Sequence, residues 1–204
     1  MLSRPVARMV GAAGFRFKVE GRSHVPEGPV VLAANHVSHV DPPFVGLALG
    51  HPIRFMAAAD LIGINRGLDF FLPFYGAILL PRSHVPLGAM KKALSHLADG
   101  GVVGVFPEGR RAAHWGEGEP KRGAAWLALR ASVPLVPVAV IGTDNVMSLE
   151  ARKVTFAPVT VRFGMPIAPE GTPATLTDRW VGEVSELLGD APPEPDPPRT
   201  STPT

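Results

Sequence analysis

GPVVLAANHVSHVDPP, residues 28–43, starts as an unbroken apolar run and ends in a polar loop with two prolines. The apolar run predicts a short buried strand. Such a strand would deliver Asn35 and His36 to its carboxyl end, where open α/β sheets bind their ligands. Pro42 suits the first turn of a helix, which makes Asp41 a candidate N-cap for a helix that runs to residue 49. We therefore predict a strand, a loop and a helix start, in that order.

His36 and Asp41 are the first candidates for chemistry in this stretch. A neutral imidazole is well matched to accepting a proton near pH 7, and a carboxylate can fix its tautomer and stabilise the imidazolium. On a continuous helix, five residues turn two side chains roughly 140° apart, so these two meet only if the backbone between them is not a plain helix. A structural role also fits each residue taken alone, with Asp41 capping the helix and Ser38 capping a turn.

Composition limits the class of protein. With 204 residues, 46% hydrophobic and 19% charged, the chain can bury one substantial core, and we predict a single domain over residues 1–189. The absence of cysteine excludes disulfides, thiolate zinc sites and a cysteine nucleophile, and it fits a cytoplasmic location. No apolar run approaches the ~20 residues that span a bilayer. The proline-rich residues 190–204 predict a disordered tail.

The first part of the chain is basic. Residues 1–22 hold five basic residues and one acidic residue, a net charge of +5 − 1 = +4. Residues 1–14 could form a short basic amphipathic segment on an anionic membrane surface, and a frayed basic terminus fits equally well. We therefore expect a peripheral protein at the inner face of the cell membrane. Nucleic acid is not an expected partner, because no dense or aromatic-interleaved basic run occurs.

Strands alternate with helices along the rest of the chain. Strands are predicted over residues 15–20, 53–58, 77–80, 102–106 and 135–141, with a hairpin or two short strands in 154–163, and helices over 66–74, 86–98, 121–131 and 176–188. Pro137 would remove a ladder donor, so we expect a bulge or an edge position there. The alternation predicts an α/β fold, a layered, mostly parallel sheet flanked by helices. In such a sheet the residues after neighbouring strand ends converge on one rim.

Four ordered blocks resemble the glycerolipid acyltransferase family, of the 1-acyl-glycerol-3-phosphate or lysophosphatidic acid acyltransferase type. The family's N-H-x-S-x-x-D motif is matched at Asn35, His36, Ser38 and Asp41. Three later stretches look like the family's second, third and fourth blocks, in that order: GAILLPR at 76–82, FPEGRR at 106–111 and VPV at 136–138. Two features depart from the family: Arg110 stands where threonine is usual, and the membrane helices often found ahead of the first block do not precede it here.

The resemblance implies transfer of a fatty acyl group from an acyl-CoA or acyl carrier protein thioester to a lysophospholipid hydroxyl, without a further cofactor. His36 would take the hydroxyl proton and Asp41 would orient the ring. A guanidinium group can bind a phosphate through two parallel N–H donors in one plane. A glycine lets backbone N–H groups approach an anion. The substrate-binding candidates are Ser38, Arg82, Glu108, Gly109, Arg111 and Lys121.

Two other functions remain open at this point. A metal-dependent hydrolase could use His36, His39 and Asp41, because imidazole and carboxylate are ordinary zinc or iron ligands. Their H-x-x-H-x-D spacing differs from H-x-H-x-D-H metal sites, so we predict no metal. A non-catalytic module that binds anionic lipid would explain the basic first segment but not the four ordered blocks.

Overall fold

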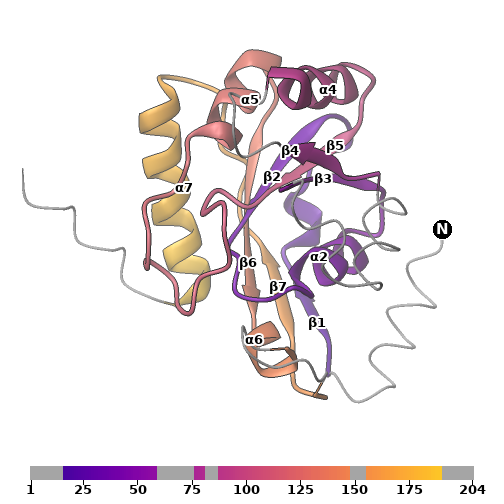
Figure 1. Cartoon of the computed structure of the whole chain (residues 1–204), viewed down its shortest axis with the longest axis vertical. Coiled ribbons are helices and arrows are strands. Elements are labelled where there is room, and N and C mark those ends of the chain that lie inside the picture. Colours follow the sequence, from indigo (N-terminus) through magenta and orange to yellow (C-terminus); the bar gives the residue numbers. More distant parts are fainter. Residues whose placement is uncertain (1–15, 59–75, 81–86, 148–154, 190–204) are drawn as a thin grey trace, which may run out of the picture.

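A seven-stranded sheet with helices on both faces organises the described part of the protein (Figure 1). The computed structural model describes residues 16–58, 76–80, 87–147 and 155–189. Its strands are β1 (Lys18–Glu20), β2 (Val30–Ala34), β3 (Ile53–Ala58), β4 (Ile78–Leu80), β5 (Val102–Val105), β6 (Leu135–Ile141) and β7 (Thr160–Phe163). Its helices are the 3-10 turn η2 (Arg22–His24), α2 (Asp41–Leu49), α4 (Leu87–Ala98), α5 (Gly123–Ala131), α6 (Thr143–Val146) and α7 (Pro173–Leu188).

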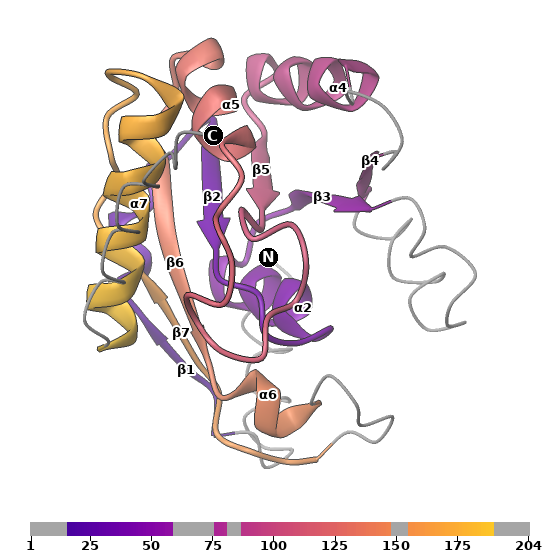
Figure 2. The ribbon, with the colours of Figure 1, turned by 60° about the vertical axis from the view of Figure 1, so that its left-hand side comes forward.

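The strand order places β2 at the centre of the sheet. The order is β1-β7-β6-β2-β5-β3-β4, and among these described strands only β6 and β7 pair antiparallel. The predicted layered, mostly parallel fold is therefore confirmed. Figure 2 shows β2 and β5 pointing the same way, toward α2. Because β6 also runs parallel to β2, the chain leaves β6, β2 and β5 at the same edge of the sheet.

The core has two halves, one on each face of the sheet. Val31 and Ala33 of β2 pack on one face against α4, α5 and α7, whereas Val30, Leu32 and Ala34 pack on the other face against α2. All five side chains are between 0% and 2% exposed. A parallel strand covered on both faces reads as an unbroken apolar run, which is why β2 was predictable. Figure 1 shows α7 and α2 on opposite sides of the strands.

The start of α2 corrects one prediction. Asp41 was expected at the N-cap, but Val40 holds that position and Asp41 is the first helical residue. No side chain caps this helix, and Pro42 lies at its second residue. The carboxylate of Asp41 turns back toward the preceding loop instead. The prediction of a capping role for Asp41 was therefore wrong.

The end of the sheet corrects another prediction. Residues 154–163 were expected to form a hairpin or two strands, but the described residues 155–163 contain β7 alone. This strand pairs with β6 on one side and with β1 on the other, rather than with the described residues 155–157 just before it. β1 lies at the edge of the sheet, where the alternation of apolar and charged residues in its sequence suits a half-exposed strand.

Pro137 lies in the interior of the sheet rather than at an edge. Its strand, β6, pairs with β2 on one side and with β7 on the other. Phe163 pairs with Val138, and Ile167 pairs with Leu135. Three residues lie between Phe163 and Ile167 but only two lie between their partners, so a bulge lies opposite Pro137. The backbone N–H of Gly164 donates to the carbonyl of Pro137 at 2.9 Å. The prediction of a bulge is thus right, but the extra residue belongs to the partner segment.

Several predictions fall on residues outside the described ranges. They are the basic segment 1–14, the helix 66–74, Arg82 and the tail 190–204. Within the described ranges, no helix has the length and apolar character needed to cross a bilayer.

Candidate active site

Asn35 anchors the site where β2 ends. Its side-chain Nδ2 donates to the carbonyl of Val140 at 3.0 Å, and the backbone N–H of Val140 donates to its Oδ1 at 2.7 Å. The main-chain pairing of β2 with β6 stops one residue earlier, at Ala34 and Val138. The amide of Asn35 therefore replaces the next pair of ladder bonds and frees the backbone to turn away. Aspartate could not do this, because it has no donor when ionised.

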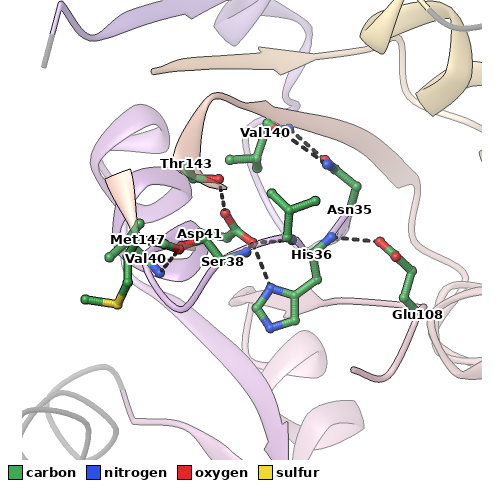
Figure 3. A network of polar contacts seen from close by, with 10 residues as sticks. Asn35, His36, Ser38, Val40, Asp41, Glu108, Val140, Thr143 and Met147 are labelled. Atoms are coloured by element: carbon green, nitrogen blue, oxygen red, sulfur yellow. Dashed lines mark hydrogen bonds and ion pairs between the residues drawn. The ribbon is translucent and has the colours of Figure 1, made fainter. Parts of the chain in front are cut away.

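His36 and Asp41 meet in the loop that follows. Nδ1 of His36 lies 2.8 Å from Oδ2 of Asp41, which is 0% exposed. The same oxygen accepts the backbone N–H groups of Val37 at 2.9 Å and Ser38 at 2.8 Å. Because an ionised carboxylate only accepts, Nδ1 carries the proton and Nε2 is left to accept one. Figure 3 shows the second ring nitrogen pointing away from Asp41, and the His36 side chain is 18% exposed, so a substrate can reach it.

The short helix α6 holds the same loop from the side of β6. The hydroxyl of Thr143 donates to Oδ1 of Asp41 at 2.5 Å, and the hydroxyl of Ser38 donates to the carbonyl of Met147 at 2.6 Å. Both Ser38 and Thr143 are 0% exposed. Ser38 was predicted to bind substrate, and in this structure its hydroxyl fixes the loop. Thr143 was missed, because no sequence pattern connects it with a motif about a hundred residues earlier.

Phe106, at the end of β5, supports the His36 ring. The two ring centroids are 4.1 Å apart with an interplanar angle of 24°. Phe106 in turn stacks on Phe55 of β3, with centroids 5.7 Å apart. This aromatic support was also missed, although the phenylalanine belongs to the third block of the sequence. It limits rotation of the imidazole out of the plane that Asp41 requires.

Glu108 fixes the backbone of His36. Its Oε1 accepts the N–H of His36 at 2.7 Å (Figure 3). The N–H of Ala112 donates to the carbonyl of His36 at 2.8 Å. Burial raises the pKa of Glu108 to about 7, against the lowering effect of the His36 N–H, and the nearby charge of Asp41 adds to the rise. The loop after β5 therefore binds both the backbone N–H and the backbone carbonyl of His36.

Arg111 and Arg110 face different surroundings. Arg110 pairs with Glu117 at 2.9 Å, and Glu117 also accepts the N–H of Ala113 at 2.5 Å. Arg111 is half-buried, and its Nη1 is buried without a hydrogen-bond partner in the part of the chain that the structure describes. Burial lowers the pKa of Arg111, whereas the charge of Asp41 raises it. A guanidinium with an unsatisfied Nη1, close enough to Asp41 to feel its charge, is a suitable donor for an anion.

Gly109 and Lys121 lie against each other in the same loop. Gly109 has a φ of 68°, and a Cβ at this position would come within 2.8 Å of Cε and 2.9 Å of Nζ of Lys121. The backbone N–H of Lys121 donates to the carbonyl of Pro107 at 2.7 Å. The lysine side chain therefore crosses the loop directly over the glycine, and its ammonium group lies beside the backbone of Gly109.

The described residues do not assemble a metal site. No group of three His, Cys, Asp or Glu side chains among them could hold an ion, and this covers His36, His39 and Asp41. Burial lowers the pKa of His39, with Arg111 and His36 contributing in the same direction. Arg82, the remaining substrate-binding candidate, lies outside the described ranges.

Known proteins resemble this chain in sequence and in fold. It is 32% identical to the 1-acyl-sn-glycerol-3-phosphate acyltransferase alpha of Homo sapiens over 166 residues, which are 78% of this chain and 57% of that protein. It is 29% identical to the chloroplastic 1-acyl-sn-glycerol-3-phosphate acyltransferase of Arabidopsis thaliana over 139 residues, 65% of this chain and 38% of that protein. The chain thus spans roughly two to three fifths of the length of these curated relatives.

A solved structure shares the fold. The crystal structure of the 1-acyl-sn-glycerophosphate (LPA) acyltransferase PlsC from Thermotoga maritima superposes with a TM-score of 0.68 at 24% identity, covering 92% of this chain and 84% of that one. The family match in sequence runs over residues 16–141, from just before β1 to the last residue of β6. Because that match covers more than half of the chain, the protein belongs to the Acyltransferase family.

Proposed function

We propose that this protein transfers a fatty acyl group from a thioester donor, acyl-CoA or acyl carrier protein, to the hydroxyl of a lysophospholipid. The first candidate for the acceptor is 1-acyl-glycerol 3-phosphate, which several relatives are named for. The observation that carries the proposal is the 2.8 Å contact between Nδ1 of His36 and the buried carboxylate of Asp41.

The chemistry follows from this pair. Nε2 of His36 takes the proton of the acceptor hydroxyl as its oxygen attacks the thioester carbonyl, and Asp41 stabilises the imidazolium that forms. The carbon–sulfur bond then breaks, the thiolate leaves, and the imidazolium returns the proton to it. The ester and the free thiol are the products, and no acyl-enzyme intermediate is required.

The acceptor's phosphate would lie beside Arg111. The unsatisfied Nη1 of this residue and the ammonium of Lys121 supply positive charge, and Arg82 stays a further candidate. We also propose that the protein works as a peripheral protein at the inner face of the cell membrane, where the donor is soluble and the acceptor is a lipid. The basic segment 1–14 stays the candidate for that attachment.

The decisive experiment incubates the purified protein with labelled acyl-CoA or acyl carrier protein and a panel of lysophospholipids, glycerol 3-phosphate and glycolipids. Replacing His36 by Ala should lower kcat by about 10²–10⁴-fold. His51, which is exposed, offers the matched control, and His51→Ala should keep the activity. Both variants should unfold at similar temperatures.

Three results would contradict the proposal. Near-normal transfer by folded His36→Ala would remove this residue from the mechanism. Loss of activity in EDTA with recovery on adding zinc would point to the metal-dependent hydrolase. Anionic vesicle binding without any acyl product across the panel would favour the non-catalytic lipid-binding module.

A further inference from the structure

We propose that Thr143 is a positioning residue that holds the Asp41 carboxylate and, through it, the tautomer of His36. The inference rests on the proposed function, because it adds a third member to the pair that would carry the acyl transfer. It concerns a residue that lies beyond the last of the four sequence blocks, and the distances around Asp41 carry it.

The two oxygens of Asp41 are held by different parts of the fold. Oδ2 accepts three hydrogen bonds from its own loop, given by the ring of His36 and the backbone N–H groups of Val37 and Ser38. Oδ1 accepts the hydroxyl of Thr143 at 2.5 Å. Since the Asp41 side chain is 0% exposed, water does not replace that donor. Loss of the hydroxyl would therefore leave one oxygen of a buried carboxylate unsatisfied.

The backbone that delivers Thr143 is tightly specified. β6 ends at Ile141, and Gly142 follows with a φ of 85°, in the left-handed region. A Cβ on Gly142 would lie 2.2 Å from the carbonyl oxygen of Pro158, so a side chain does not fit here. This turn aims the first residue of α6 at the loop after β2. At the other end of α6, the carbonyl of Met147 accepts the hydroxyl of Ser38.

The consequence for His36 is a choice between its two neutral tautomers. With Oδ2 aimed at the ring, Nδ1 carries the proton and Nε2 accepts the proton of the acceptor hydroxyl. If the carboxylate rotates, Nδ1 loses its acceptor and the proton can shift to Nε2, which makes that nitrogen unable to act as a base. Thr143 opposes this rotation from α6, which follows β6, whereas the loop that holds His36 and Asp41 follows β2.

The test compares Thr143→Val, which removes the hydroxyl and keeps the shape, with Thr143→Ser, which keeps the hydroxyl. Thr177→Val is the matched control, because Thr177 is also buried and its hydroxyl donates within α7. Thr143→Val should lower kcat by about 10- to 100-fold with little change in the KM of the acyl donor, as expected for a group that supports a directly acting residue. Thr143→Ser should recover most of kcat.

Nitrogen-15 NMR of the His36 ring gives a second readout that needs no substrate. The signal is assigned by its loss in His36→Ala. Wild type, Thr143→Ser and Thr177→Val should show the Nδ1–H tautomer, and Thr143→Val should show a mixture of both. This result would support the role of Thr143 even if no acyl acceptor were found, so the two proposals can fail separately.

A folded Thr143→Val protein with the wild-type tautomer would overturn the proposal, whatever its kcat. So would equal losses in Thr143→Ser and Thr143→Val. If Thr143→Val does not fold, Thr143→Ala removes the same hydroxyl with less crowding, and the same tautomer shift is expected. In the wild type, the Thr143 hydroxyl proton should exchange slowly with water, and a freely exchanging proton would contradict its bond to the buried carboxylate.

Discussion

Replacing Asp41 by Asn isolates the charge of the carboxylate from its geometry. In the wild type, Oδ2 accepts hydrogen bonds from His36, Val37 and Ser38. Among the described residues, only Thr143 donates to Oδ1. The amide of the variant should therefore place its oxygen at the Oδ2 position. Its NH₂ group then faces the hydroxyl of Thr143, which can turn and accept.

This orientation sets the size of the effect. The hydrogen bond from Nδ1 of His36 survives, so the tautomer is kept, but the imidazolium loses its anionic partner. A hydrogen bond to a charged group contributes about 1.5–3 kcal/mol and one to a neutral group about 0.5–1.5 kcal/mol, so losing the charge alone should cost about 1–1.5 kcal/mol, or roughly 5- to 15-fold in kcat/KM. The loss should be smaller than for His36→Ala, which removes the base itself. Stability should fall by only about 1–2 kcal/mol, because every buried polar atom keeps a partner.

The assay measures acyl transfer at saturating donor over a range of acceptor concentrations, with the His36 tautomer followed by nitrogen-15 NMR. An unchanged kcat/KM in folded Asp41→Asn would show that the charge plays no part. A loss as large as that of His36→Ala, together with a switch to the Nε2–H tautomer, would mean that the NH₂ group faces the ring. That result would refute the reasoning from the three donors at Oδ2.

Two further changes follow from the loop after β5. Glu108→Gln keeps an oxygen for the N–H of His36 but no longer titrates. The pKa of Glu108 is raised to about 7, so the wild type loses stability relative to Glu108→Gln as the pH rises from about 4.5 to above 7. Allowing for partial exposure, the difference should be about 1–2 kcal/mol in urea unfolding, and a gap that does not widen with pH would contradict the buried carboxyl. Arg111→Lys should raise the KM of a phosphorylated acceptor about 10-fold or more while the donor KM stays constant, and Arg110→Thr should change neither, because Arg110 pairs with Glu117 at the surface. If Arg110→Thr raised the KM of the acceptor more than Arg111→Lys does, the acceptor phosphate would bind beside Arg110 rather than beside Arg111.

The fold was predictable where buried segments show a clear hydrophobic pattern in the sequence. The predicted strands 53–58 and 135–141 have the bounds of β3 and β6. For β6 the reason is that a strand covered on both faces is apolar throughout, and its residues 135–140 are all buried. The helix predicted at 86–98 matches α4 over the described residues Leu87–Ala98. The predicted hairpin failed because two short apolar runs in succession indicate strands but not their partners, and β7 finds its partners in β1 and β6.

The His36–Asp41 pair was predictable, but the residues that hold it were not. Thr143 and Glu108 lie 102 and 72 residues from their partners in the sequence. They come together because β6 and β5 are the two neighbours of β2 in the sheet. The hydrophobic periodicity of a single segment does not predict the order of strands in a sheet. Parallel order alone predicted that the residues after β2 and β5 would converge. It could not indicate that Glu108 binds the backbone of His36 rather than a substrate hydroxyl.

The two prolines after Asp41 explain why its carboxylate is free to serve His36. A helix usually begins with N–H groups that need partners, and an aspartate near the start often supplies one. In α2 the backbone N–H of Asp41 donates to the preceding loop, Pro42 and Pro43 have no N–H, and Phe44 donates to the loop again. No donor at the start of this helix therefore competes for the carboxylate. The prolines that suggested a capped helix in the sequence instead remove the need for a cap, and that leaves both oxygens of Asp41 to the site.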